Sequence, residues 1–290
     1  MRQATDFRPA RRKGRAEPTQ KTGPEARLAR LRLRDKLSAT IMGEANMFTS
    51  WRGVIGIIHP TLRPGSNEEL IRMLPEGIGV LSLHVNITRG TPDEFKQMKS
   101  AYEKELDLLK EAGCDVIHPS GAPPFMVHGR KGEAQLIKQW EKRYGVPMFT
   151  SGQNHVNALK ALGAKSIVGA TYFPEKTNQI FAQYFKDAGF NVKAMAGVDV
   201  AFNKVQELSG EAVYAHIKKA FLKAKGADAI YMLGSGWRTL HIIELLEQDL
   251  GVPVIHPVPA RVWEFQKRLH VNEKIEGFGH LVREMPNYSF

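Results

Sequence analysis

The chain has little of several features that mark particular classes of protein. One cysteine in 290 residues excludes an internal disulfide framework and any cysteine-rich zinc module, and it fits a reducing, cytoplasmic location. No apolar run approaches the ~18 residues that a membrane-spanning helix needs, so we expect no membrane insertion. Hydrophobic residues make up 42% and charged residues 24%, which is ordinary for a globular protein.

Basic charge is concentrated at one end of the chain. Residues 1–50 hold 12 Lys and Arg against 5 Asp and Glu, so they carry +7 of the total +11 and leave +4 for the other 240 residues. The segment lacks a strand pattern, and we predict a basic, disordered tail. An organelle-targeting segment and a nucleic-acid contact remain alternatives. Nucleic-acid binding rests on this tail alone.

A short pattern occurs twice in the chain. In each copy a Gly-x-Asp turn leads into an apolar run and a glycine-containing loop with a hydroxyl residue; a helix-like stretch follows, and Gly-Val-Pro opens another apolar run. The copies comprise residues 112–121 with 144–147, and residues 225–236 with 250–253. Such an order is typical of parallel α/β folds. The repetition indicates two half-molecules whose loops face each other across a cleft, which favours an enzyme.

Strand-like and helix-like stretches alternate from Trp51 onward. Besides the two runs of the repeat, strands are predicted at 54–58, 79–85, 147–151, 166–171, 192–198 and 252–256, and the clearest helix at 92–112. We predict an α/β fold with two pseudo-symmetric Rossmann-like halves, parallel sheets and an active-site cleft between them. The first half comprises 51–156 and is completed by 257–290, and the second comprises 157–256.

The carboxyl ends of parallel strands are where such folds bind ligands, so loop residues there are the candidates. Glycine-rich loops and helix N-termini present backbone amides to a carboxylate or an enediolate oxygen. Serine hydroxyls there can hydrogen-bond a carboxylate or act as nucleophiles. The catalytic candidates are Ser120 and Ser235. The substrate-binding candidates are Gly121, Ala122, Gly234, Gly236, Trp237, Thr150 and Tyr172.

Histidines end several of the predicted strands. His59, His118 and His256 each precede a proline, and His84 ends a further strand. His59 or His118 is a candidate proton donor, because the pKa of imidazole lies near neutrality. Two alternatives stay open: each histidine merely caps a strand end, or several of them bind a divalent metal in a hydrolase. No carboxylate at short spacing supports the metal site.

The order of the loops resembles the aspartate/glutamate racemase superfamily, and within it most the branch of maleate isomerase and arylmalonate decarboxylase. The resemblance covers about residues 52–282. It rests on Gly56-Ile57-Ile58-His59-Pro60, Ala112-Gly113-Cys114-Asp115, Ala161-Leu162-Gly163-Ala164-Lys165, Leu250-Gly251-Val252-Pro253-Val254 and Gly277-Phe278-Gly279. It implies a cofactor-independent enzyme that acts on a small carboxylic acid.

The chain departs from this superfamily in its cysteines. Members typically act through one or two cysteines on the facing loops, but here the first position corresponds to Ser120 and the second to Gly234 or Ser235. The single cysteine, Cys114, precedes its strand and is expected to be a buried structural thiol. Racemisation and thiolate-dependent isomerisation suffer most from this loss. Decarboxylation through an enediolate depends chiefly on stabilising charge, so it suffers least.

We therefore expect a decarboxylase-type lyase for a malonate-like or other small dicarboxylic acid, with no cofactor. An isomerase or racemase of a small dicarboxylate, a non-catalytic carboxylate-binding pseudoenzyme and a metal-dependent hydrolase are the alternatives. The expected partner is a small carboxylic acid, and a homo-oligomer remains open.

Overall fold

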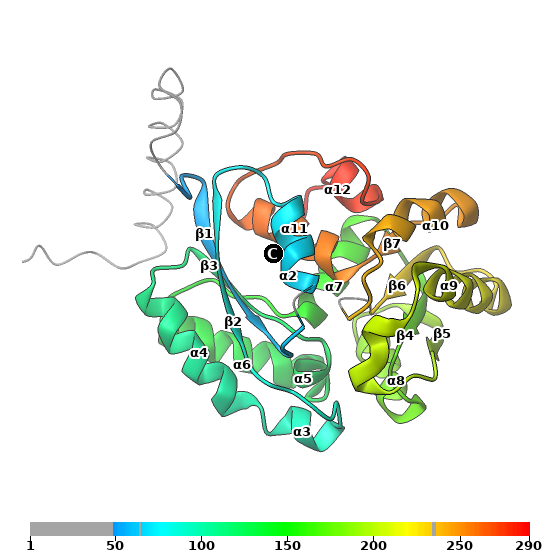
Figure 1. Ribbon diagram of the computed structural model, residues 1–290, viewed down its shortest axis with the longest axis horizontal. Coiled ribbons are helices and arrows are strands. Elements are labelled where there is room, and N and C mark those ends of the chain that lie inside the picture. The colour runs from blue at the N-terminus through cyan, green and yellow to red at the C-terminus, as the bar shows by residue number, and fades with distance from the viewer. Residues whose placement is uncertain (1–48, 64, 234–235) are drawn as a thin grey trace, which may run out of the picture.

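A computed structural model describes residues 49–63, 65–233 and 236–290 (Figure 1). The tail predicted for residues 1–50 lies almost wholly outside the described residues. The strands are β1 (Gly53–His59), β2 (Ile78–His84), β3 (Val116–Pro119), β4 (Ser166–Thr171), β5 (Asn191–Gly197), β6 (Ala229–Met232) and β7 (Val254–Ile255). The helices are α2 (Gly65–Met73), α3 (Pro92–Lys96), α4 (Lys99–Glu111), α5 (Pro123–Met126), α6 (Gly129–Tyr144), α7 (Ser151–Ala161), α8 (Glu175–Asp187), η1 (Phe202–Glu207), α9 (Gly210–Ala224), η2 (Leu240–Ile242), α10 (Ile243–Leu250), α11 (Pro257–Arg268) and α12 (His280–Glu284).

The strands form two parallel sheets, seen on the left and right of Figure 1 with helices around both. One has the order β2-β1-β3 and the other the order β5-β4-β6-β7. All the pairings within these sheets are parallel. This confirms the predicted α/β fold with two Rossmann-like halves. The half boundaries stay a prediction, although α11, late in the chain, packs against α2 and α7 of the first half.

The repeated Gly-x-Asp turn has the same structural role in both sheets. Asp115 precedes β3, and its Oδ2 accepts a 2.9 Å hydrogen bond from the backbone N of Val54 in β1. Asp228 precedes β6, and its Oδ1 accepts a 2.9 Å hydrogen bond from the N of Ser166 in β4. Each carboxylate thus satisfies a backbone amide at the start of the neighbouring strand and fixes where the two strands begin.

The repeated Gly-Val-Pro ends a helix in each half. Gly145 and Gly251 follow α6 and α10 with φ of 66° and 67°, a left-handed conformation that glycine adopts without strain. The carboxylates of Glu141 and Glu247 each accept, at 2.9 Å, the amide of the residue seven positions later. The glutamates and the glycines are both 106 residues apart in sequence (247 − 141 and 251 − 145). The second half therefore repeats the first from this helix into the next one.

Two predicted strands are wrong in length. The segment predicted at 147–151 keeps a single bridge at Met148, and that at 252–256 keeps only the two residues of β7. In each segment the chain turns early into a helix, because Thr150 caps α7 and His256 caps α11 with their side chains. An apolar run does not reveal how soon such a cap ends a strand.

The helix predicted at 92–112 is interrupted. Gln97 and Met98 donate their backbone hydrogen bonds to carbonyls three residues earlier, so the chain tightens between α3 and α4. Phe95 of α3, which is 2% exposed, lines the cavity described below, while α4 packs against sheet strands.

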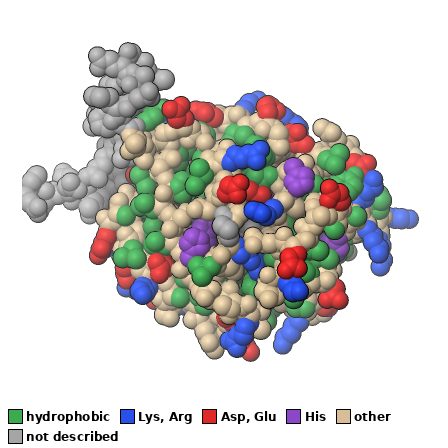
Figure 2. All heavy atoms as spheres, viewed as in Figure 1, with side chains coloured by type: hydrophobic (Ala, Val, Ile, Leu, Met, Phe, Trp, Pro, Cys, Tyr) green, Lys and Arg blue, Asp and Glu red, His purple; other side chains and the backbone are tan. Residues whose placement is uncertain are grey.

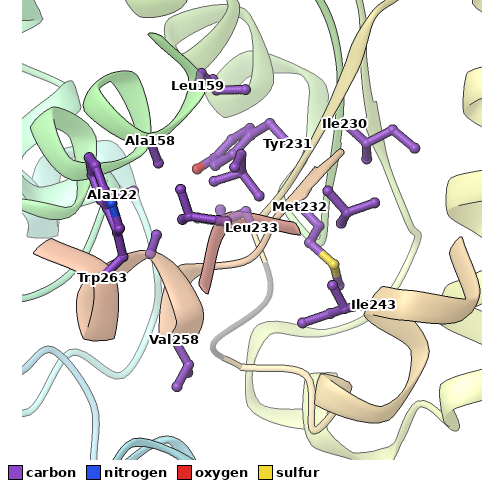
Figure 3. Close-up of a cluster of buried hydrophobic side chains, with 14 of the residues drawn as sticks. Ala122, Ala158, Leu159, Ile230, Tyr231, Met232, Leu233, Ile243, Val258 and Trp263 are labelled. Carbon is purple, nitrogen blue, oxygen red and sulfur yellow. The ribbon is translucent and has the colours of Figure 1, made fainter. Parts of the chain in front are cut away.

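A continuous apolar core joins the two halves. One cluster of buried side chains contains both Ile55 of the first sheet and Ile230 of the second. Figure 3 shows Tyr231 of β6 beside Leu159 of α7, with Val258 of α11 in the same cluster. Helices α7 and α11 therefore position the ends of the two sheets relative to each other through close packing.

Two features of the described residues concern possible partners: the distribution of surface charge and the length of the apolar helices. On the face drawn in Figure 2, basic and acidic side chains are interspersed over the described residues. Among the helices of the part described, none is both long and apolar enough to cross a membrane.

Candidate active site

A small cavity of ≈ 40 Å³ lies where the carboxyl ends of β1, β3, β4 and β6 approach one another. It is lined by His59, Pro60, Thr61, Arg63, Ile87, Phe95, Ser120, Gly121, Ala122, Pro123, Pro124, Tyr172, Phe173, Phe202, Leu233, Gly236 and Arg261. Among these described lining residues are two arginines and no aspartate or glutamate. A cavity with this balance of charge favours an anionic ligand.

The loop after β3 contributes a serine hydroxyl to the cavity. Ser120 lines the cavity and is 1% exposed. The backbone N of Gly121 donates to Ser151 Oγ at 3.0 Å, so this amide is already engaged. The backbone N of Ser120 donates to Ile58 O at 2.9 Å, and the two prolines after Ala122 have no N–H, so Ala122 supplies the remaining backbone N–H of this loop. The anion cradle of backbone amides stays a prediction for this loop, and Ser120 contributes a hydroxyl to the described lining.

The loop after β6 is described only in part. Gly234 and Ser235, both predicted site residues, lie outside the described residues. Leu233 and Gly236 line the cavity on either side of them. Trp237, another predicted ligand contact, is 0% exposed, lies outside the cavity lining and packs edge-on against Tyr172 at a ring distance of 5.3 Å. Trp237 therefore packs against a residue of the cavity wall and does not itself line the cavity.

Tyr172 projects from the end of β4 and is the phenol in the described lining. Its oxygen is hydrogen-bonded to the side chain of Arg63 and to the backbone of Gly236. Burial raises the pKa of Tyr172, and the neighbouring cations only partly oppose that effect. The group is therefore a neutral phenol at physiological pH.

His59 ends β1 and lines the cavity, as the sequence led us to expect for a strand-end histidine. It is 2% exposed and its ring stacks on His84, with centroids 4.8 Å apart. Burial, helped by the positive charge of Arg261, lowers the pKa of His59 to about 3. The imidazole is neutral at physiological pH, and a role for His59 as proton donor stays a prediction.

His118 lies in the wall behind the cavity. It is 0% exposed, and its Nδ1 lies 2.7 Å from the carbonyl oxygen of Phe149 while its Nε2 lies 3.3 Å from Ser151 Oγ. Burial, with the charge of Arg261, lowers the pKa of His118 well below its usual value. The ring is outside the described lining, so direct proton donation by His118 does not fit this structure.

Thr150 has a structural position. Its Oγ1 accepts the backbone N–H of Gln153 at 3.2 Å, as the N-cap of α7, and donates to Glu133 Oε1 at 2.6 Å. The side chain is 0% exposed and outside the described lining. The prediction that Thr150 binds the substrate is not supported by this placement.

Sequence reasoning missed the two arginines of the cavity. Arg261 comes from α11 and is 2% exposed, and Arg63 comes from the loop after β1. Arg63 donates to the carbonyl oxygen of Phe202, whose ring lies 4.4 Å beneath its guanidinium. A usable signal for Arg261 was present: it is a cation between the apolar Ala260 and Val262, in the first turns of a helix that starts at a strand end.

The structure also shows where Cys114 lies and whether the described side chains could form a metal site. Cys114 is a fully buried thiol in an apolar cluster with Leu109 and Ile117, as predicted, and it is not part of the described lining. Over residues 49–63, 65–233 and 236–290, no group of three or more His, Cys, Asp or Glu side chains is arranged to hold a metal ion. The predicted strand-end histidines thus form no such group there.

A family model described as arylmalonate decarboxylase matches residues 55–282 of the chain. The chain belongs to the arylmalonate decarboxylase family. Arylmalonate decarboxylase from Bordetella bronchiseptica is 25% identical over 248 residues, which cover 79% of this chain and 96% of that protein. Maleate isomerase from Geobacillus stearothermophilus is 24% identical over 243 residues, with 79% and 96% covered. The branch predicted from the loop motifs is confirmed.

Solved structures share the fold of this arylmalonate decarboxylase family member. The maleate isomerase Iso from Pseudomonas putida S16 gives a TM-score of 0.73 at 19% identity and covers 80% of this chain and 99% of that one. A crystal structure of arylmalonate decarboxylase gives a TM-score of 0.69 at 20% identity, with 80% and 99% covered. That Ser120 and Gly234 or Ser235 stand where the superfamily has cysteines stays a prediction.

Proposed function

We propose that the chain is a cofactor-independent lyase that decarboxylates a small malonate-like dicarboxylic acid. One observation carries the proposal: the cavity between the two sheets presents two arginines, a serine hydroxyl and a tyrosine hydroxyl, with no carboxylate among its described lining residues. Membership of a family that includes relatives named arylmalonate decarboxylase and maleate isomerase supports an enzyme acting on a small dicarboxylate.

Decarboxylation suits a cavity that has cations on one part of its wall and apolar side chains on another. The bond from the α-carbon to one carboxylate breaks, CO₂ leaves, and the electron pair moves into the retained carboxylate to form an enediolate. The retained group gains negative charge, so preorganised donors such as Arg261 and Ser120 stabilise the transition state more than the substrate. The departing group becomes neutral, which suits the apolar wall at Ile87 and Phe95.

The enediolate must then take a proton at carbon. His59 is a weak acid in this cavity because its imidazole is already neutral. Tyr172 is better placed, since its oxygen already interacts with Arg63 and the backbone of Gly236, which leaves its own hydroxyl proton to be donated into the cavity. We assign the proton donor to Tyr172, with water replenishing the proton after each turnover.

A binding protein without catalysis is the second candidate. It is favoured by the absence of cysteine from the described lining, because a chain that has lost a thiol mechanism keeps an anion-binding cleft. Isomerisation by addition of a thiolate has no nucleophile in that lining.

Proton NMR in D₂O separates these functions. Malonate, methylmalonate, phenylmalonate and maleate are each incubated with the purified chain. The lyase is expected to convert at least one malonate to the monocarboxylate with a single deuterium at the α-carbon and release bicarbonate. Fumarate formed from maleate would instead identify an isomerase. Thermal stabilisation by a malonate without any product would identify the binding protein and overturn the lyase.

A further inference from the structure

Arg261 is a buried cation whose surroundings do not explain its burial. It lies in α11 between Ala260 and Val262 and is 2% exposed, yet it lines the cavity. Its neighbours in the helix are apolar and fully buried, which leaves the guanidinium in a medium that solvates charge poorly. A buried charge in such a place is normally paired and hydrogen-bonded.

No described residue supplies those hydrogen bonds. Both Nε and Nη1 of Arg261 are buried and have no hydrogen-bond partner among the described residues. Glu69 of α2 is the acid whose charge acts most on it. However, Glu69 Oε2 is itself buried without a partner in the same part of the chain, so this oxygen makes no hydrogen bond to the guanidinium.

Two other arginines near Arg261 do have hydrogen-bond partners. Arg268, two turns further along α11, donates from Nε and Nη2 to Glu264 Oε1 at 2.9 and 2.7 Å. Arg63, across the cavity, donates to a backbone carbonyl. Helix α11 thus has two arginines. Arg268 pairs with Glu264 of the same helix, whereas Arg261 lines the cavity.

We infer that Arg261 binds the retained carboxylate of the substrate, and that the ligand is a short dicarboxylate whose departing carboxylate faces the apolar wall at Ile87 and Phe95. The guanidinium is planar and permanently charged. Its Nε and Nη1 lie on different edges of that plane, and each has an N–H to donate to an oxygen of the ligand. Burial lowers the pKa of Arg261 to about 10, so it remains a cation at physiological pH.

The size of the cavity restricts the ligand. A volume of ≈ 40 Å³ between two arginines admits a diacid with one or two carbons between its carboxyl groups more readily than a long chain. The inference rests on the proposed function only for the identity of the substrate as a malonate, and binding through Arg261 stands even if the ligand is not turned over.

Three variants test Arg261 by calorimetry and thermal unfolding, with malonate as the probe and propionate as the monocarboxylate control. Arg261→Met removes the charge at similar volume, and Arg261→Lys keeps the charge but loses the planar guanidinium with its separate Nε and Nη1 donors. Arg268→Met is the matched control on the same helix. We expect Arg261→Met to bind malonate at least about 30-fold more weakly and Arg261→Lys to be intermediate. Arg268→Met should bind malonate as the unmodified chain does.

Stability without ligand should move in opposite directions in the two methionine variants. Arg261→Met relieves an unpaired buried charge and is expected to raise the Tm, whereas Arg268→Met strands Glu264, which is 0% exposed, and is expected to lower it. A structural arginine would give a lower Tm in Arg261→Met and unchanged malonate affinity, and that result would overturn the inference. Malonate binding that depends on Arg261 without bicarbonate release would sustain the inference and overturn only the lyase.

Discussion

Thr150 Oγ1 donates a 2.6 Å hydrogen bond to Glu133 Oε1, which connects the start of α7 to α6. The second oxygen of this carboxyl group accepts from the hydroxyl of Tyr184 on α8, in the other half of the molecule. Glu133 is 1% exposed. The three side chains therefore form a buried polar bridge between the halves, and this bridge explains why Thr150 is withheld from the cavity.

The bridge predicts a pH-dependent stability. Burial raises the pKa of Glu133 to about 7, from 4.5 in the unfolded chain, although its two hydrogen bonds oppose the shift. The unfolded chain ionises first as pH rises, so this group contributes most stability below about pH 4.5 and loses on the order of 3 kcal/mol by pH 7. Glu133→Gln should flatten that part of the profile, measured by urea unfolding at about pH 5 and about pH 7.5.

A matched control tests whether the pH dependence of stability comes from Glu133. Glu111→Gln changes an exposed residue at the end of α4 and should leave the slope between the two pH values as it is in the unmodified chain. An unchanged slope in Glu133→Gln would show that another group causes the dependence.

A cysteine substituted for Ser120 should have a reactive thiol. Ser120→Cys places sulfur on the cavity wall, whereas Cys114 is buried in an apolar cluster. Native Ser120→Cys should be alkylated by iodoacetamide once per chain and protected by malonate, while the unmodified chain should react only after unfolding. Mass spectrometry of the labelled peptides checks both. Labelling of Cys114 in the native chain would contradict its assignment as a structural thiol.

Gly236 is expected to tolerate no side chain. A Cβ there would lie 2.7 Å from Tyr172 Oη and 3.0 Å from Arg63 Nη1. Gly236→Ala should therefore displace the phenol and lower turnover by about 10²-fold or more with little loss of Tm. Gly132→Ala, on α6 and outside the described lining, is the control, and it should keep full turnover. Full turnover in Gly236→Ala would show that this part of the wall moves.

The sequence was a good guide to the fold because its signals are local. Gly145 and Gly251 end helices in a conformation that favours glycine, and Asp115 and Asp228 bind neighbouring strand starts, so both repeats are scaffold features with fixed spacing. The strands of each sheet then follow from alternation of apolar and amphipathic segments. What failed was the length of the strands predicted at 147–151 and 252–256. Thr150 and His256 cap the next helices through hydrogen bonds to residues two or three positions on, and the apolar pattern gives no weight to such caps.

The site was harder to predict because burial decides its chemistry. His59 has a near-neutral pKa in isolation, but the cavity lowers it to about 3, which no sequence pattern reveals. Arg261 was missed because it lies in a helix rather than a loop. Its counterpart in the first half, 106 residues earlier, is His155, which is 0% exposed and whose nitrogens have no hydrogen-bond partner among the described residues. Searching both copies for polar residues at this position would have found the pair.

Glu69 gives the cavity a further pH dependence. Burial raises the pKa of Glu69 to about 7 against the opposing charges of Arg261 and Arg238. Below that pH Glu69 is neutral and the charge of Arg261 is available to a ligand, whereas above it the ionised carboxylate competes for the same guanidinium. Malonate is therefore expected to bind several-fold more weakly at about pH 8 than at about pH 6.5, as calorimetry at both values can measure. In Glu69→Gln the affinity should stay level at its low-pH value, while Glu111→Gln, which changes an exposed residue at the end of α4, should keep the slope of the unmodified chain. An identical slope in Glu69→Gln would assign the dependence to the ligand or to another group.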